Sequence, residues 1–341
     1  MQRWRLRVWA GFLGVVPHGV LVVALCLLVG CTYQPANPEA REPAPRPTHL
    51  APTFPIWSFR TEAGDDKNDH YRTEKFSFVT YDDVLGDFDT VEGEIYLPLP
   101  AADRSVPLVE VSPILAGALT GYLECRYFCR RMARRGFAGF FLYQEERLLQ
   151  PHLDAVELER SLRSSTRATV KALHALVEHY PIDEDRLASF GISFGGIRNT
   201  LLAAAEPRLR ANVICLAAGD LSYVISVSQE PGVRRYLAER EELTGSTQAE
   251  ICADIEAHLE SDPMTVAGCL DPNSLLLFFA RFDDVVAPDA SWRLHQALGQ
   301  PAVWVVPAGH YGAVLIYPWA IDRSGEFLGE ALSWPPRERS L

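Results

Sequence analysis

The chain has 341 residues, with 44 acidic residues against 32 lysines and arginines, so its formal net charge is −12. This acidic balance disfavours nucleic acid as a partner, because a nucleic-acid backbone repels a negatively charged surface. The length suits one large folded domain, which we expect over residues 56–335, better than two separate domains.

The first 30 residues have the parts of a secretory signal. Three arginines open the chain, an apolar run follows at residues 20–29, and no acidic residue occurs before Glu39. A membrane-spanning anchor is the alternative, because residues 8–29 are almost long enough to cross a bilayer. Pro17 and the short apolar core favour a signal peptide that is removed.

The end of this segment reads Leu28-Val29-Gly30-Cys31. It resembles a bacterial lipobox, in which a peptidase cuts before the cysteine and the cysteine then carries lipid. The resemblance implies a signal peptide at residues 1–30, lipidation of Cys31 and a membrane-anchored protein of the cell envelope. Thr32 stands where an inner-membrane retention signal would have aspartate, which favours the outer membrane of a Gram-negative cell. Cleavage would leave 29 basic and 44 acidic residues, a net charge of −15.

Prolines dominate the next segment, at positions 35, 38, 43, 45, 47, 52 and 55. Such a stretch favours extended backbone and forms no packed element. We therefore predict that residues 31–55 are the lipidated cysteine and a semi-rigid tether to the folded domain.

Five cysteines lie in the domain, an odd number, so at least one thiol has no disulfide partner within it. Cys252 and Cys269 flank a helical pattern and form the preferred pair, whereas Cys215 lies in an apolar strand and suits a buried position. No cysteine or histidine spacing is typical of zinc, so we expect no metal.

Strand and helix patterns alternate along the domain. Residues 75–81 and 91–98 predict an antiparallel opening pair of strands. The later strands are expected at residues 107–113, 137–144, 186–192, 211–219, 274–280 and 301–307, with helices at 122–135, 154–179 and 194–206. This alternation predicts the α/β class, with a mostly parallel, twisted sheet and helices on both faces.

Two parts of the chain lie outside this alternation. Residues 220–268 contain two amphipathic helical patterns and no convincing strand, which predicts a helical insertion, or lid, over one edge of the site. Three aromatic residues near the C-terminus, Tyr311, Tyr317 and Trp319, are expected to pack the final helix.

A glycine-rich turn joins the strand at 186–192 to the helix at 194–206. It reads Gly191-Ile192-Ser193-Phe194-Gly195, followed by Gly196. A nucleophile on a sharp strand-to-helix turn needs small neighbours, since strand and helix approach closely there. The helix N-terminus also directs backbone N–H groups and positive partial charge toward Ser193. The pattern therefore predicts a nucleophilic serine.

The stretch DEDRLASFGISFGG resembles the approach to the nucleophile in the α/β-hydrolases, and the similarity of strand order extends over about residues 75–331. The resemblance implies an α/β-hydrolase fold. It also implies a serine, acid and histidine in that chain order, with the acid after the seventh strand and the histidine after the eighth.

The expected positions hold suitable residues. His310 follows the strand at 301–307, where its imidazole can take the proton of Ser193 and return it. The stretch RFDDVVAP after the strand at 274–280 resembles the family's G-x-x-D-x-V-V-P, which selects Asp283 to orient His310. Asp284 and Asp220 are the alternative acids.

One donor of an oxyanion hole is expected to be the backbone N–H of Phe194. The other should come from the loop after the third strand, where lipases and esterases of the family often have His-Gly. This chain has Ser112-Pro113-Ile114-Leu115 instead. Ile114 or Leu115 can present an N–H, whereas proline has none.

These residues predict a serine hydrolase that cleaves carboxylic esters through an acyl-enzyme, with a small-molecule or acyl-ester substrate and no metal or organic cofactor. A peptidase or acyltransferase would use the same three residues, and fold alone does not separate these activities. A non-catalytic envelope lipoprotein that retains the scaffold is the alternative from another class.

Overall fold

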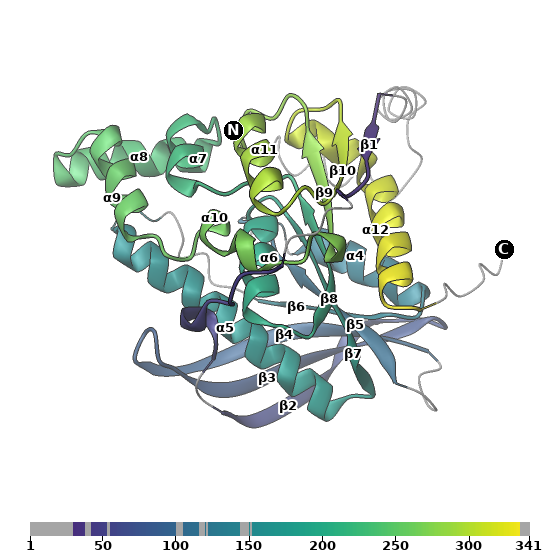
Figure 1. The fold of residues 1–341 in the computed structure, drawn as a ribbon. Coiled ribbons are helices and arrows are strands. Elements are labelled where there is room, and N and C mark those ends of the chain that lie inside the picture. The colour runs from purple at the N-terminus through teal and green to yellow at the C-terminus, as the bar shows by residue number, and fades with distance from the viewer. Residues whose placement is uncertain are drawn as a thin grey trace.

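The computed structural model describes residues 30–37, 42–52, 55–99, 105–115, 120, 122–143, 150 and 152–334. Within them, ten strands form one sheet in the order β1-β10-β9-β8-β7-β5-β6-β4-β3-β2 (Figure 1). The strands are β1 Thr32–Gln34, β2 Ile56–Lys67, β3 Tyr71–Asp82, β4 Asp87–Pro98, β5 Val106–Ser112, β6 Ala138–Leu142, β7 Ile182–Ile192, β8 Leu209–Cys215, β9 Leu275–Ala280 and β10 Ala302–Val306.

The centre of the sheet is parallel, from β6 through β5, β7, β8 and β9 to β10. Every residue of β5, β6 and β9 is buried, as expected for strands covered on both faces. β2, β3 and β4 are antiparallel to their neighbours. The predicted mostly parallel α/β sheet with an antiparallel opening pair is confirmed.

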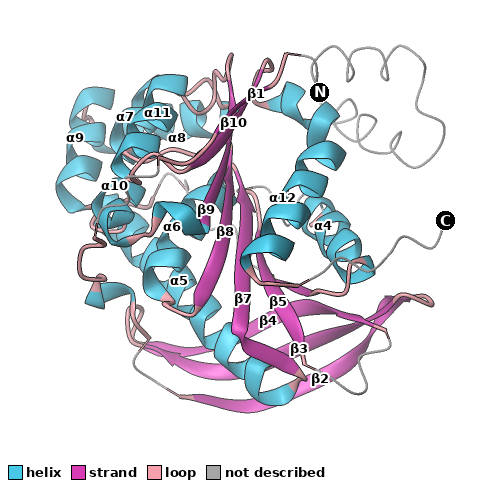
Figure 2. Ribbon diagram, turned by 45° about the vertical axis from the view of Figure 1, so that its right-hand side comes forward, coloured by secondary structure: helices cyan, strands magenta, loops and turns pink. Residues whose placement is uncertain are grey.

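Helices cover both faces of the sheet. Figure 2 shows α4 and α12 on one face and α5, α6 and α11 on the other. The helices are η2 Thr48–Leu50, α4 Leu123–Arg134, α5 Ala155–His179, α6 Phe194–Ala205, α7 Leu221–Val227, α8 Pro231–Thr244, α9 Gln248–His258, α10 Pro263–Val266, η3 Ala267–Cys269, η4 Pro272–Ser274, α11 Pro288–Ala297, η5 Tyr311–Ile316 and α12 Tyr317–Ala331.

The edge strand β2 is not among the sequence predictions. None of its residues is buried, and it shows no alternation of buried and exposed positions of the kind that marks a half-buried strand. Its pairing with β3 is also irregular, with register shifts after Trp57 and after Ala63. The partner strand β3, rather than a pattern within β2, therefore defines this edge.

The described parts of the proline-rich segment contact the domain, whereas the sequence predicts a semi-rigid tether without a packed element. β1 pairs with β10, and the rings of Tyr33 and Trp304 pack in a tilted arrangement with their centroids 4.8 Å apart. Further along, the backbone N–H of Ala44 donates to the carbonyl of Gly268 over 2.9 Å, and Leu50 is fully buried. A proline-rich segment has few N–H groups to satisfy, so scattered carbonyls on the domain surface are enough to hold it.

The predicted helical insertion is confirmed, and α7 and α10 add to the two expected helices α8 and α9. Asp262 anchors it internally, because its carboxylate accepts hydrogen bonds from the backbone N–H groups of Asp220 and Leu221. α9 packs on α5, and α10 packs on α6 (Figure 1). The insertion is therefore continuous with the helical layer of the domain.

The preferred disulfide is wrong. Cys252 carries a free thiol on α9, so it is not bonded to Cys269. Burial raises the pKa of the Cys252 thiol. Cys252 packs in the apolar core beneath α9, where a small hydrophobic side chain needs no covalent partner. Cys215 is buried, as expected.

Of the predicted signal peptide, residues 1–30, all but Gly30 lie outside the described residues. In the part of the chain that the structure describes, no helix has both the length and the apolar character needed to cross a membrane.

Candidate active site

Ser193 lies on a strained turn between β7 and α6. Its backbone has φ of 57° and ψ of −125°, outside the regions that non-glycine residues favour. The Ser193 N–H donates to the carbonyl of Cys215 at the end of β8 over 2.8 Å. Strain of this kind persists only where the surroundings over-determine it, and it concentrates at functional sites.

The three glycines around Ser193 each permit a close contact. A Cβ atom at Gly191 would lie 2.1 Å from the carbonyl oxygen of Gly195, and one at Gly195 would lie 2.2 Å from that of Ser112. A Cβ at Gly196 would lie 2.7 Å from the Cβ of Ala217. Any larger residue would push the turn away from β5 or β8. The glycines therefore bring strand, helix and the loop after β5 together around Ser193.

His310 links Ser193 to Asp283. Its Nε2 atom is 2.9 Å from Ser193 Oγ, and its Nδ1 atom is 2.8 Å from Asp283 Oδ2. The other carboxylate oxygen of Asp283 accepts hydrogen bonds from the backbone N–H groups of Val285 and Val286. With Nδ1 donating to the carboxylate, Nε2 is left to accept the Ser193 hydroxyl proton. Ser193, His310 and Asp283 are called the triad below.

The two alternative acids lie elsewhere. Asp284 is exposed, and its backbone carbonyl accepts a hydrogen bond from Gln229. Asp220 caps α7, where it accepts from the N–H of Tyr223, and it forms an ion pair with Arg293 at 2.7 Å. Asp283 is the one of the three whose carboxylate contacts His310.

The N-terminus of α6 offers donors next to Ser193. The N–H groups of Gly196 and Ile197 bond to the Ser193 carbonyl, so those of Phe194 and Gly195 have no acceptor within the helix. Of the two loop candidates, Ile114 directs its N–H to the carboxylate of Glu124. Leu115 is then the remaining candidate of the pair for a second donor.

A buried polar cluster lies beneath this loop, and sequence reasoning did not identify it. Burial raises the pKa of Glu110 on β5 to about 8, against the opposing effects of Arg198 on α6 and a hydrogen bond from Ser112. Burial likewise lowers the pKa of Arg198 to about 10. Burial also raises the pKa of Glu124, although hydrogen bonds to its carboxylate act in the opposite direction and lower it. Perturbed groups of this kind cluster at functional sites.

The insertion contacts the two loops that carry Asp283 and His310. The backbone N–H of Gln229 donates to the carbonyl of Asp284 over 2.8 Å, and the hydroxyl of Tyr311 donates to Glu230. Tyr311 is 62% exposed beside His310, so the expectation that it packs the final helix is wrong. Tyr317 and Trp319 do pack inside, against Tyr127 and Trp304 respectively.

Potential metal ligands gather at one place among the described residues, and none of the triad belongs to that group. The arrangement at Ser193 instead provides a hydroxyl, a base hydrogen-bonded to it, an acid that orients the base, and a helix N-terminus. Such a set can carry out acyl transfer without a metal ion.

The chain matches no protein-family model. A stretch of 151 residues, 41% of the chain, is 30% identical to Hydrolase acrC of Aspergillus aculeatus. The match spans about a third of that protein, 34% of its length.

Solved structures share the fold more widely. Acetyl xylan esterase 1 from Thermoanaerobacterium sp. is 14% identical, with a TM-score of 0.55 over 79% of this chain and 87% of that one. An acetyl xylan esterase from Paenibacillus sp. R4 is 15% identical, with a TM-score of 0.55 over 79% of this chain and 88% of that one. A puromycin-hydrolyzing peptidase of Mycobacterium tuberculosis is 17% identical, with a TM-score of 0.54 over 78% of this chain and 46% of that one. The chain therefore has the α/β-hydrolase fold.

Proposed function

We propose that this protein is a serine hydrolase that cleaves carboxylic esters through a covalent acyl-enzyme. The observation that carries the proposal is the continuous hydrogen-bond chain from Ser193 through His310 to Asp283 at a strained turn. A hydroxyl becomes a strong nucleophile when an adjacent base accepts its proton, and the base works best when a third group fixes its tautomer.

In the first half of the reaction, Ser193 Oγ attacks the substrate carbonyl carbon while its proton moves to His310 Nε2. The negative charge that develops on the carbonyl oxygen is stabilised by the N–H of Phe194 and by that of Leu115. The carbon–oxygen bond to the alcohol then breaks, and the leaving alkoxide takes the proton from His310. The acyl group remains on Ser193.

In the second half, His310 takes a proton from water, and the resulting hydroxide attacks the acyl carbon. The bond to Ser193 Oγ breaks, the proton returns to Ser193, and the carboxylic acid leaves. Asp283 stabilises the imidazolium that forms in both halves without itself becoming protonated.

Ester cleavage is the favoured reaction because an alkoxide is a better leaving group than an amide anion, so an ester depends less on protonation of the leaving group. The solved structures of the same fold include acetyl xylan esterases and a peptidase, so fold alone does not select the bond. We propose a small acyl-ester substrate, and the insertion, which contacts the loops of Asp283 and His310, is positioned to shape its pocket.

The test is hydrolysis of p-nitrophenyl esters of short and medium chain length by the wild-type protein and by Ser193→Ala and His310→Ala. We expect turnover in the wild type and a loss of at least about 10³-fold in either variant. A fluorophosphonate probe should label the wild type and not Ser193→Ala. Equal turnover in a well-folded Ser193→Ala would refute the nucleophile. Cleavage of aminoacyl amides in preference to esters would instead identify a peptidase.

We further propose that Cys31 is lipidated and anchors the protein in the outer membrane of a Gram-negative cell, with residues 1–30 removed. The support is the lipobox sequence, and Cys31 directly precedes β1. A lipid there would hold the β1–β10 edge of the sheet close to the membrane. Cys31→Ser should move the protein from the membrane to the soluble fraction, and continued membrane association would contradict the anchor.

A further inference from the structure

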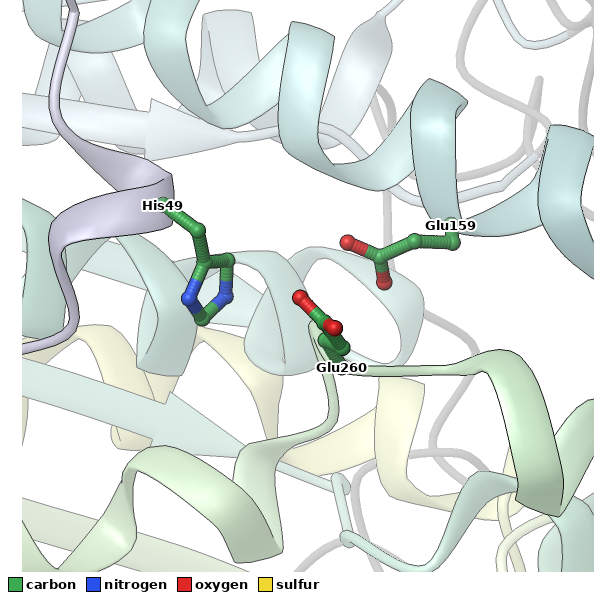
Figure 3. Close-up of side chains that lie close together, drawn as sticks. All are labelled: His49, Glu159 and Glu260. Carbon is green, nitrogen blue, oxygen red and sulfur yellow. The ribbon is translucent and has the colours of Figure 1, made fainter.

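Three side chains from distant parts of the chain face one another away from the triad. His49 belongs to η2, Glu159 to α5, and Glu260 follows α9 in the insertion (Figure 3). Each offers one ligand atom, and these atoms all lie within 4.8 Å of one another. Figure 3 shows the imidazole and the two carboxylates pointing into the space that they share.

The polar groups of this cluster are incompletely satisfied. Nε2 of His49 is buried and has no hydrogen-bond partner among the described residues. Glu159 is only 6% exposed, and its carboxylate accepts hydrogen bonds from the N–H and the hydroxyl of Ser261. No lysine or arginine of the described chain pairs with it. A buried carboxylate without a cation is costly, and so is a buried nitrogen without a partner.

We propose that His49, Glu159 and Glu260 bind one zinc-class divalent cation. One imidazole nitrogen and two carboxylate oxygens are ligands that Zn²⁺ uses, and water can complete a tetrahedral site. Zn²⁺ holds such ligands at about 2.0–2.2 Å, which places two tetrahedral ligands about 3.4 Å apart, so the donor atoms need to approach one another by about 1.4 Å at most. Glu260 is exposed and its carboxylate makes no other described contact, so its side chain can supply that movement.

The backbone around the ligands is already fixed. Arg167 on α5 donates two hydrogen bonds to the carbonyl of His49, and Thr265 donates one to the carbonyl of Glu260. The ion would therefore join three prepositioned segments: the N-terminal segment, α5 and the insertion. Its role is to hold the insertion and the proline-rich segment on the domain, independently of the reaction at Ser193. No ligand spacing in the sequence reveals such a site, because each ligand comes from a different segment.

The test is zinc binding by the full chain, purified without a histidine tag and freed of metal with a chelator. Titration calorimetry with Zn²⁺ should give one ion per chain, and Zn²⁺ should raise the Tm. Glu260→Gln should weaken the affinity by more than about tenfold while leaving the metal-free Tm unchanged, because its side chain is exposed. His49→Gln should weaken it similarly.

Two matched variants on α9, the helix that precedes Glu260, serve as controls. His258 pairs with Asp254 on the exposed face of α9, and Glu256 is exposed nearby. His258→Gln and Glu256→Gln should keep the wild-type affinity. The proposal is overturned by absence of saturable Zn²⁺ binding. It is also overturned by a preference for Ca²⁺ over Zn²⁺, or by loss of zinc in His258→Gln with retention in Glu260→Gln.

Discussion

The two ends of helix α6 are held in opposite ways. At its N-terminus no side chain caps the helix, and glycines let backbone press against backbone around Ser193. At its C-terminus charged side chains gather instead. Arg46 donates to the carbonyls of Ala203 and Ala204, and Glu206 accepts hydrogen bonds from Arg208.

This difference shows how one helix can serve both chemistry and stability. In the proposed reaction, the N-terminal N–H groups are left for the negative charge that develops on the substrate, whereas the C-terminal carbonyls accept hydrogen bonds from the Arg46 guanidinium. Substitutions at the first end should therefore change activity most, and substitutions at the second end should change only stability.

The largest effect on activity is expected from Asp283, whose carboxylate orients His310 beside Ser193 at the N-terminal end of α6. Asp283→Asn should lower kcat/KM for an ester by about 10³–10⁴-fold. Asparagine would stabilise the wrong tautomer of His310, and its neutral amide would not stabilise the imidazolium that forms during the reaction. Steady-state kinetics checks this. Asp284→Asn and Asp220→Asn are the matched controls and should stay within a few-fold of wild type. A comparable loss in Asp284→Asn alone would reassign the acid.

Gly195→Ala should disrupt the close packing at the N-terminal end of α6. The new Cβ would lie 2.2 Å from the Ser112 carbonyl oxygen, so the loop after β5 must shift. We expect a loss of about 3 kcal/mol in the free energy of unfolding, measured in urea, together with lost activity. Gly232→Ala on α8 meets nothing within 4 Å and should be neutral or stabilising by about 0.5 kcal/mol. Equal stability of both variants would contradict this account of the turn.

At the C-terminal end, Glu206 should give a pH-dependent contribution. Burial alone would raise the pKa of Glu206, but hydrogen bonds from His174 and Arg208 outweigh it and lower the pKa to about 2. A lowered folded-state pKa stabilises the protein above the unfolded value near 4.3, and this contribution is lost as the pH falls toward 2. Glu206→Gln should cost roughly 2–3 kcal/mol at pH 7, with the difference from wild type vanishing near pH 2.

Urea denaturation as a function of pH measures this difference. Glu184→Gln is the control, because Glu184 is 68% exposed and lies 3.9 Å from Arg208. Its effect should stay below about 0.5 kcal/mol at every pH. A Glu206→Gln deficit that is constant from pH 7 to pH 2 would rule out the ionised pair as its source.

The smallest effect is expected from the proline-rich segment. Arg46→Ala removes the two hydrogen bonds to the last carbonyls of α6 and should cost about 1 kcal/mol, with activity unchanged. Thermal denaturation and ester hydrolysis measure the two quantities. Arg60→Ala, on the exposed edge strand β2, should change neither. A loss of activity in Arg46→Ala without a loss of stability would show that the two ends of the helix are coupled.

The sequence predicts the elements whose signals are local. The strands from β5 to β10 are apolar runs bounded by turn residues, and the glycines around Ser193 mark the turn directly. The proximity of Asp283 and His310 to Ser193 follows from strand order, since residues after parallel strands meet at one edge of the sheet.

Other features depend on partners that the sequence does not specify. β1 and β2 are edge strands defined by β10 and β3, and the acceptor of the Ile114 N–H is a side chain of the following helix, α4. The free thiol of Cys252 likewise follows from packing beneath α9 rather than from its spacing to Cys269. Such long-range choices are made by tertiary contacts, which outweigh local preference.

The pairing of β1 with β10 has a consequence for the order of folding. It joins Thr32 to Val305, so the first described strand of the chain meets its partner only after almost the whole domain has been synthesised. Contacts between residues so far apart in sequence form late and slow the search for the native state. The sheet should therefore close at this edge last, and until then β10 presents an unpaired edge to other chains.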